Sequence, residues 1–258
     1  MNYTTYFSRG QKVFLITINQ DQDDSIFKAF SATITNCDNN SFELRPRYAL
    51  HHNEEGLLKT GMQFKVTSES YGCGVQLKGT ISKISGSHFT LVPADLIEMY
   101  QRSQVPRIDL TLGFYSFTRN APLSVFRHEW SRFIDGLSTK TAQQLGLVSS
   151  QINLGVGGVR YVVEPTEQQT ELSMVFIELE HGHPPVCAVA EQLWRRSFPD
   201  EEGVAIGRRF VQIRKSDQDR IQEFILLQHK KQGKKEKKSK NNWELLDRML
   251  HELPSAQP

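Results

Sequence analysis

The 258-residue sequence predicts a mainly β protein of two small antiparallel β-barrels, with a helical insert and a C-terminal helix. Short runs rich in β-branched and aromatic residues recur along the chain, and compact turns of Gly, Asn, Asp and Ser separate them. This spacing is typical of small barrels and sandwiches. Residues 121–147 and 217–227 instead place apolar residues at helical spacing.

The first half of the chain predicts a barrel or sandwich over residues 1–93. Its six strand-like runs are 13–18, 27–34, 41–46, 62–67, 75–81 and 88–92. Pro93 is expected to end the last of them, because proline cannot donate a backbone hydrogen bond to a sheet. Residues 94–101 then predict a short, helix-permissive connector between two domains.

The second half, residues 102–229, opens with an alternating strand at 108–114 and then breaks its β pattern. In the insert 121–147, apolar residues from Leu123 to Leu137 recur at helical spacing, and a second short helix is expected from Ser138 to Leu145. Two interpretations are open. The insert either packs on the barrel or presents Trp130 and its neighbours to a partner protein.

Strand-like runs return after the insert and predict a second barrel. They are residues 148–152, 159–163, 172–179, 186–195 and 203–213. Residues 217–227 follow as a helix with an acidic first turn, which suits the positive end of a helix dipole.

The last 29 residues form a tail of two parts. Residues 230–240 hold seven lysines and one glutamate, too polar a run to fold alone. Residues 243–250 are amphipathic, with Trp243 and Met249 on one stripe. The tail is either solvated or docks on the body of the protein, on a partner or on an anionic membrane.

Composition excludes several classes of function. The total charge of +2 includes +6 from residues 230–240, so the rest of the chain carries −4, and a basic face for duplex nucleic acid is not expected. Single-stranded nucleic acid binding by a barrel with a lysine tail is disfavoured for the same reason. No apolar run approaches the roughly 18 residues of a membrane span.

The first residues and the cysteines predict a cytoplasmic protein. Residues 1–6 lack the charged and apolar regions of a secretory signal. Cys37, Cys73 and Cys187 are an odd number and far apart, which argues against a disulfide framework or a zinc site.

Motifs of common enzymes are missing from the sequence, which has no nucleophile elbow, metalloprotease helix or phosphate-loop lysine. His181, His183 and Cys187 have the residue types of metal ligands, but they sit beside two prolines without a carboxylate partner. We therefore expect no catalysis, no metal and no cofactor.

The stretch from Asn153 to Gly158 stands out between two strand-like runs because three of its last four residues are glycine. Glycine permits positive φ and close backbone approach. Such a connection is either a simple bulge or tight bend, or a place where backbone amides meet an anion.

Two arginines, Arg102 and Arg107, lie where the chain enters the second half. Guanidinium groups bind phosphates bidentately, stack on purines and donate to the O6/N7 edge of guanine. Together with a glycine-rich loop, they predict a clamp for a guanine nucleotide.

These elements resemble the PilZ domain, the bacterial receptor module for cyclic di-GMP. That family carries Arg-x-x-x-Arg at its entry and Asp/Asn-x-Ser-x-x-Gly on an early strand, and the run Asn153–Gly158 matches the second element in spacing. Gly155 stands in place of the serine, and four residues separate Arg102 from Arg107 instead of three. The first half resembles the split-barrel-like domain that precedes PilZ in flagellar-brake proteins.

The resemblance implies a cyclic di-GMP receptor that changes the orientation of its two domains and regulates a motility or biofilm partner. Arg102 and Arg107 would hold guanine and phosphate, and Asn153 would orient a base or an arginine. Gly155, Gly157 and Gly158 would admit the ligand to the barrel surface. The alternative is a PilZ-like adaptor that does not bind nucleotide and acts through protein contacts.

Overall fold

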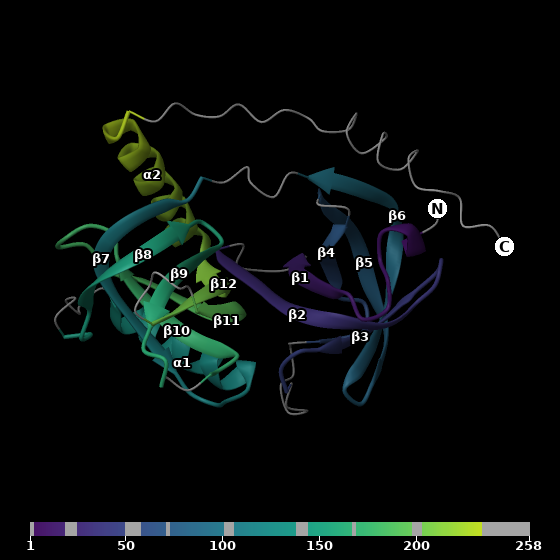
Figure 1. Cartoon of the computed structure of the whole chain (residues 1–258). Coiled ribbons are helices and arrows are strands. Elements are labelled where there is room, and N and C mark those ends of the chain that lie inside the picture. The colour runs from purple at the N-terminus through teal and green to yellow at the C-terminus, as the bar shows by residue number, and fades with distance from the viewer. Residues whose placement is uncertain are drawn as a thin grey trace.

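The computed structural model describes residues 3–18, 25–49, 58–70, 73–100, 106–137, 144–166, 169–197 and 203–233. Two closed barrels of six strands each lie side by side in this described part, the first drawn in purple and blue and the second in teal and green (Figure 1). The predicted fold class, mainly β with two small antiparallel barrels, is confirmed. Neither described α-helix is long and apolar enough to cross a membrane.

The first barrel follows a 3-10 helix, η1 (Tyr3–Thr5), and closes where its first strand pairs with its second. The strand order around it is β1-β4-β5-β6-β3-β2. Its strands are β1 (Lys12–Ile18), β2 (Ile26–Cys37), β3 (Phe42–Pro46), β4 (Gln63–Ser70), β5 (Cys73–Ser85) and β6 (His88–Tyr100).

The connector predicted at residues 94–101 is wrong for most of its length, because strand β6 continues through it to Tyr100. Opposite β5, Ile97 pairs with Leu77, and Ile97 packs against the core. Pro93 does not end the strand because it lies opposite Gly79, next to a register irregularity, where a missing backbone N–H is tolerated. The first barrel therefore extends to residue 100.

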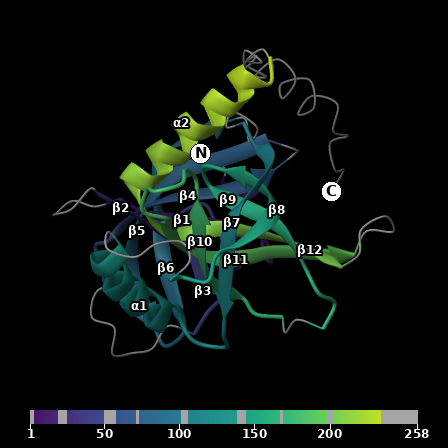
Figure 2. The ribbon, with the colours of Figure 1, turned by 90° about the vertical axis from the view of Figure 1, so that its left-hand side faces the viewer.

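The second barrel has the strand order β12-β11-β10-β7-β8-β9 and closes where β12 pairs with β9. Helix α2 (Lys215–Lys231) lies across it (Figure 2). The helix was predicted at residues 217–227, and it buries Ile221, Phe224 and Ile225 in the core of this barrel. The strands are β7 (Ile108–Thr118), β8 (Val148–Gly155), β9 (Gly158–Val163), β10 (Leu172–Glu178), β11 (Val186–Ser197) and β12 (Val204–Arg214).

The helical insert packs on the protein's own core. Helix α1 (Leu123–Gly136) buries Leu123, Phe126 and Trp130, each at most 1 % exposed. The Trp130 indole Nε1 donates a hydrogen bond of 2.8 Å to the Cys187 carbonyl oxygen on β11. Trp130 is thus unavailable as a contact element for a partner. Of the predicted second helix, residues 138–143 lie outside the described residues, and residues 144–146 form a turn.

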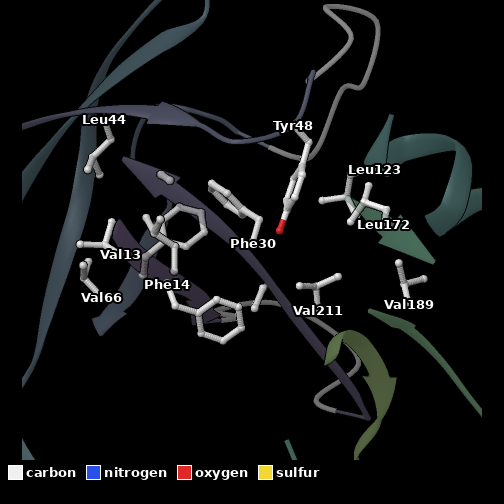
Figure 3. Packing of buried hydrophobic residues seen from close by; sticks show 14 of the residues in the cluster. Val13, Phe14, Phe30, Leu44, Tyr48, Val66, Leu123, Leu172, Val189 and Val211 are labelled. Carbon is white, nitrogen blue, oxygen red and sulfur yellow. The ribbon is translucent and has the colours of Figure 1, made fainter. Parts of the chain in front are cut away.

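The two barrels share a continuous apolar core. Phe14 and Phe30 of the first barrel belong to the same buried cluster as Leu123, Val189 and Val211 of the second (Figure 3). The N-terminal end of β2 also pairs with β12, through Lys28 opposite Gln212 and its two neighbours. Each barrel therefore contributes both backbone pairing and buried surface to the other.

A buried carboxyl group bridges the barrels inside this interface. The Ser31 hydroxyl of β2 donates a hydrogen bond of 2.7 Å to Oε1 of Glu191 on β11. Glu191 is fully buried, and its Oε2 has no hydrogen-bond partner among the described residues. Burial raises the pKa of Glu191. The hydrogen bond from Ser31 and the charges of Arg209, Arg47 and Lys12 lower it, but burial has the larger effect.

We predict that Glu191→Gln makes the protein less sensitive to rising pH. A carboxyl whose pKa is raised by folding contributes its full stability below its ordinary value of 4.5, and that contribution is lost as pH rises through the raised pKa. Glutamine keeps an acceptor for Ser31 but cannot ionise. In urea unfolding from about pH 4 to about pH 8, the free energy of unfolding of the variant should rise relative to that of the wild type as the pH increases. Glu43→Gln, at an exposed carboxylate of β3, is the control. A pH-independent difference between the variant and the wild type would contradict the prediction.

Candidate functional site

The run from Asn153 to Gly158 is the tip of the hairpin between β8 and β9. Gly155 pairs with Gly158, and Val156 and Gly157 form the turn between them. None of the three glycines adopts a positive φ, so of the two properties that glycine permits, positive φ is not used at this loop. The hairpin is an ordered turn that continues the barrel wall.

Two of the glycines are explained by neighbouring groups that lie too close to leave room for a side chain. A Cβ on Gly158 would lie 2.2 Å from the carbonyl oxygen of Arg208, because β9 pairs with β12 at this point. A Cβ on Gly155 would lie 3.0 Å from Cγ of Arg107. Gly157 is exposed and has no atom within 4 Å of an added Cβ.

Arg107, immediately before β7, lies across this hairpin. Its Nε donates a hydrogen bond of 2.6 Å to Oδ1 of Asn153. Its Nη2 donates to the carbonyl oxygens of Asn153 at 3.0 Å and Gly158 at 3.3 Å. The structure thus brings together Arg107, Asn153, Gly155 and Gly158 of the predicted site, with Gly157 at the adjoining turn. Arg102 lies outside the described residues.

A polar row crosses three strands beside Arg107. Asp109 is opposite Asn153, and Asn153 is opposite Arg160. The Asn153 amide donates a hydrogen bond of 2.9 Å to Oδ1 of Asp109, and Arg160 Nη2 lies 3.3 Å from the same oxygen. Both ion-pair side chains are well exposed, Arg160 at 41 % and Asp109 at 62 %. This ion pair is therefore open to solvent and ligands.

The two arginines repel each other. Arg107 remains partly open to solvent, but the hairpin beneath shields its guanidinium, and this desolvation lowers its pKa. The charge of Arg160 lowers it further, while Asp109 acts in the opposite direction. Two cations facing one carboxylate leave a local excess of positive charge, which favours an anion.

A further arginine adjoins the hairpin from the other side. Arg209 on β12 lies opposite Gly158 in the barrel register, and its guanidinium carbon is 4.3 Å from the ring centroid of Phe14. Gly158 therefore has the Arg107 side chain on one side and the backbone of Arg209 on the other, while the Arg209 guanidinium lies over Phe14. Both arginines carry a group that binds phosphate and guanine.

The sequence analysis missed Asp109, Arg160 and Arg209. Alternation along the strands offered a signal for the first two, because it places them on the same face as Asn153 once β7, β8 and β9 are neighbours. Arg209 could not be found in this way, since its proximity depends on the closure of the barrel between β9 and β12.

A hollow of about 610 Å³ opens beside the polar row, a size that suits a small-molecule ligand. Asp109, Asn153 and Arg160 line it together with the apolar side chains Val148 and Val162. Ion-pairing groups beside an apolar wall can hold a phosphate and a base at the same time.

The histidines and the cysteine that have metal-ligand residue types do not converge. Cys187 is buried in the core, where desolvation raises its thiol pKa. His181 is fully exposed and lies 3.3 Å from Glu178. No group of three His, Cys, Asp or Glu suited to a metal ion occurs among the residues that the structure describes.

Comparison with known proteins finds likeness at the level of structure. No protein-family model and no curated protein matches the sequence. The inhibitor of motility MotI/DgrA of Bacillus subtilis is 14% identical, with 86% of this chain and 98% of that chain covered and a TM-score of 0.36. YcgR of Escherichia coli, solved in complex with c-di-GMP, is 11% identical, with 93% and 88% covered and a TM-score of 0.33.

A third solved structure is a tetrameric PilZ domain from Xanthomonas campestris, 16% identical, which covers 50% of this chain and 90% of that chain with a TM-score of 0.33. The chain is similar to PilZ-domain proteins. At these identities and scores the likeness decides nothing about what the chain binds, which has to follow from its own residues.

We predict that two adjacent glycines of the hairpin differ sharply in their tolerance of alanine. Gly158→Ala places a methyl group against the backbone of β12 and should cost about 1–3 kcal/mol of unfolding free energy, as overpacking does. In Gly157→Ala the added methyl group has no atom within 4 Å, and the backbone φ at this position is one that alanine adopts readily. The free energy of unfolding should therefore change by less than about 1 kcal/mol. Urea unfolding measures both. Equal losses in the two variants would show that the β9–β12 contact does not set the requirement.

Proposed function

We propose that this protein is a non-enzymatic, cytoplasmic receptor for cyclic di-GMP that changes the relative orientation of its two barrels and so regulates a motility or biofilm partner. The observation that carries the proposal is the contact of Arg107 with Asn153 across the glycine hairpin. This contact joins the entry of the second barrel to the motif that resembles the PilZ ligand loop.

The resting contacts of Arg107 suit an exchange with a phosphate. Its acceptors are one amide oxygen and two backbone carbonyls, all neutral. In these bonds only the guanidinium is charged, whereas in a bond to a phosphate both partners are charged and their Coulombic attraction is added. A phosphodiester arriving over Gly155 would therefore draw the guanidinium away from the hairpin.

Asn153 and Arg160 suit the remainder of such a ligand. Arg160 is held by a solvent-exposed ion pair, whose worth is typically no more than about 1 kcal/mol, so it can turn toward a ligand at little cost. Its guanidinium can then donate to the O6/N7 edge of guanine or to a second phosphate. In the proposed complex, Arg102 joins Arg107 from the adjoining connection.

The position of Arg107 in the chain supports a mechanical output. It follows the connection between β6 of the first barrel and β7 of the second, so a ligand that draws on Arg107 pulls on that connection. Reorientation of two domains about an interface is a common form of switching.

Isothermal titration with cyclic di-GMP tests the proposal. We expect heat of binding for the wild type and a loss of about tenfold or more for Arg107→Ala, since a charged hydrogen bond contributes about 1.5–3 kcal/mol and about 1.4 kcal/mol is tenfold. Arg107→Lys should recover little, because an ammonium lacks the planar fork. Arg45→Ala, at an exposed arginine of the first barrel, is the matched control. No heat at high micromolar ligand, with a folded protein, would overturn the proposal.

We predict a gain of affinity from Gly155→Ser. Serine restores a hydroxyl that can donate to a phosphate, worth about 0.5–1.5 kcal/mol, or about twofold to tenfold in affinity. Its Cβ would lie 3.1 Å from Nη1 of Arg107, so it would also shift this flexible side chain away from its neutral acceptors. Gly155→Ala separates the two effects because it shifts Arg107 without adding a hydroxyl. A serine variant no better than alanine would show that the hydroxyl has no partner in the complex.

The same contact also supports a second candidate, the adaptor that does not bind nucleotide. Arg107 donates three hydrogen bonds to the hairpin and so stabilises the fold at this point. Gly155 has no hydroxyl that could donate to a phosphate. The protein would then act through protein contacts. The proposed contact element in residues 230–258 lies largely outside the described residues. Pull-downs with and without those residues test this candidate, and an unchanged set of partners would dismiss a role for the tail.

A further inference from the structure

The interior of the second barrel contains polar side chains in addition to its apolar core. Ser173, Gln192 and Arg208 each lie two strand positions from a residue of that core, so alternation turns them to the same side. Gln192 and Arg208 are opposite each other in the register of β11 and β12. All three side chains are buried, and none is more than 8 % exposed. A guanidinium is therefore enclosed inside the barrel.

Arg208 has only neutral partners in the part of the chain that the structure describes. Its Nε donates a hydrogen bond of 2.8 Å to the Tyr161 hydroxyl. Its Nη2 donates to Oγ1 of Thr170 at 3.3 Å and to the carbonyl oxygen of the same residue at 3.4 Å. Its Nη1 is buried and has no hydrogen-bond partner among the described residues. A buried charge is costly unless it is paired, and no described side chain supplies a counter-ion to this one.

Two further polar atoms of this interior are also buried without a partner among the described residues, Oγ of Ser173 and Oε1 of Gln192. A serine hydroxyl can donate to an anion, and a glutamine amide can turn to present its NH2 group instead of its oxygen. Buried polar atoms in folded proteins nearly always have a partner. Unpartnered atoms around a buried cation therefore indicate that an anionic molecule binds there.

The hollow beside the polar row leads to this interior. Strands β8 and β9 pair only between the hairpin and Ile152–Tyr161, whereas β7 continues to Thr118, beyond the start of β8. The hollow of about 610 Å³ lies between these three strands, and Phe114, Ser116 and Tyr161 are part of its lining. Because Phe114 and Tyr161 also belong to the barrel core, the hollow extends from the surface toward that core.

Hydrogen bonds join the hollow to the buried guanidinium. The hydroxyl oxygens of Ser116 and Tyr161 are 2.9 Å apart, and the Tyr161 hydroxyl accepts from Arg208. Because this oxygen accepts from a cation, its own proton is free to be donated to Ser116 or to a ligand. A ligand in the hollow can thus meet two hydroxyl donors that lie in front of a positive charge.

These groups select a small carboxylate with one negative charge. A single buried cation is neutralised by a monoanion, whereas a dianion such as phosphate would leave excess charge in a poorly solvated interior. Guanidinium and carboxylate also match in geometry. Phe114, Ile152 and Val163 line the hollow as apolar groups, which suits a short aliphatic chain. At the rim, the carboxylate of Asp109 is already paired with Arg160 and repels an entering anion less.

We propose that the interior of the second barrel binds a small aliphatic monocarboxylate, which enters through the hollow and is held by Arg208, Tyr161 and Ser116. The bound carboxylate neutralises Arg208 and stabilises the second barrel. This site does not use Arg107 or the glycine hairpin, and the inference does not depend on the binding of cyclic di-GMP.

Thermal unfolding of the full-length protein in sodium butyrate tests the proposal. Butyrate replaces chloride at constant ionic strength, so that general effects of salt cancel. We expect a stabilisation that saturates with concentration. At about ten times the dissociation constant, the ratio of folded to unfolded protein should rise about tenfold, which corresponds to an increase of about 3–6 °C in Tm.

Two variants with matched controls locate the effect. Arg208→Met removes the buried charge at a similar side-chain length and should abolish the stabilisation by butyrate, whereas Arg45→Met, at an exposed arginine of the first barrel, should retain it. Ser116→Ala should weaken butyrate binding about twofold to tenfold. Its control is Ser150→Ala, which lines the same hollow but donates to the Val148 carbonyl oxygen. The serine pair decides the test if Arg208→Met does not fold.

Two results would overturn the proposal. One is a wild-type Tm that does not rise in a saturable way when butyrate replaces chloride, because water would then satisfy the guanidinium. The other is a butyrate response that is the same in Ser116→Ala as in Ser150→Ala and is kept by any folded Arg208→Met. Titration with cyclic di-GMP is a separate measurement: a protein that responds to butyrate but gives no heat with the nucleotide supports this site and contradicts only the receptor function.

Discussion

Strand β2 is the constraint on which the arrangement of both barrels depends. Its first residues, Ile26 to Lys28, pair with β12 of the second barrel, and the residues that follow pair with β1 and β3 of the first. A strand has only two edges, so a single continuous backbone fixes the register of both sheets at once. In this structure the angle between the barrels is therefore held by hydrogen bonds as well as by side-chain packing, and the reorientation in the proposed function has to displace these contacts.

The placement of the cations follows from that register. With β12 fixed against β2, Arg209 lies opposite Gly158 and reaches Phe14 of the first barrel. A slip of one residue would exchange Arg209 with the buried Arg208, whose Nε donates to the Tyr161 hydroxyl inside the barrel. The same pairing of β12 with β9 thus places Arg209 on the outer face of the barrel and Arg208 inside it. A change of register would move both side chains at once.

Sequence predicts the elements of this protein well, because each strand and helix is specified by side chains a few residues apart. The strand at residues 88–92 shows the limit. Nothing local to Pro93 reveals that Gly79 lies opposite it, and so the continuation of β6 to Tyr100 was missed. Arg107 and Asn153 could be linked only because their motifs resemble those of a known family. Arg209 and Lys65 are 144 residues apart, and they line the same cavity only once both barrels are packed together.

The glycine hairpin illustrates a second limit, which concerns conformation. A glycine-rich run suggests positive φ, but here the glycines serve the approach of Arg107 and of β12 with ordinary backbone angles. Composition alone cannot separate these two uses, since both require only the absence of Cβ.

The energetics of Arg107 decide what kind of ligand the site can take. A ligand has to replace three hydrogen bonds that the charged guanidinium donates to neutral acceptors before it gains anything. A neutral ligand would exchange equal bonds and gain little. A phosphate replaces these bonds and adds attraction between opposite charges, and it also offsets the repulsion between Arg107 and Arg160. In the proposed function, the resting contacts of the arginine therefore favour an anionic ligand over a neutral one.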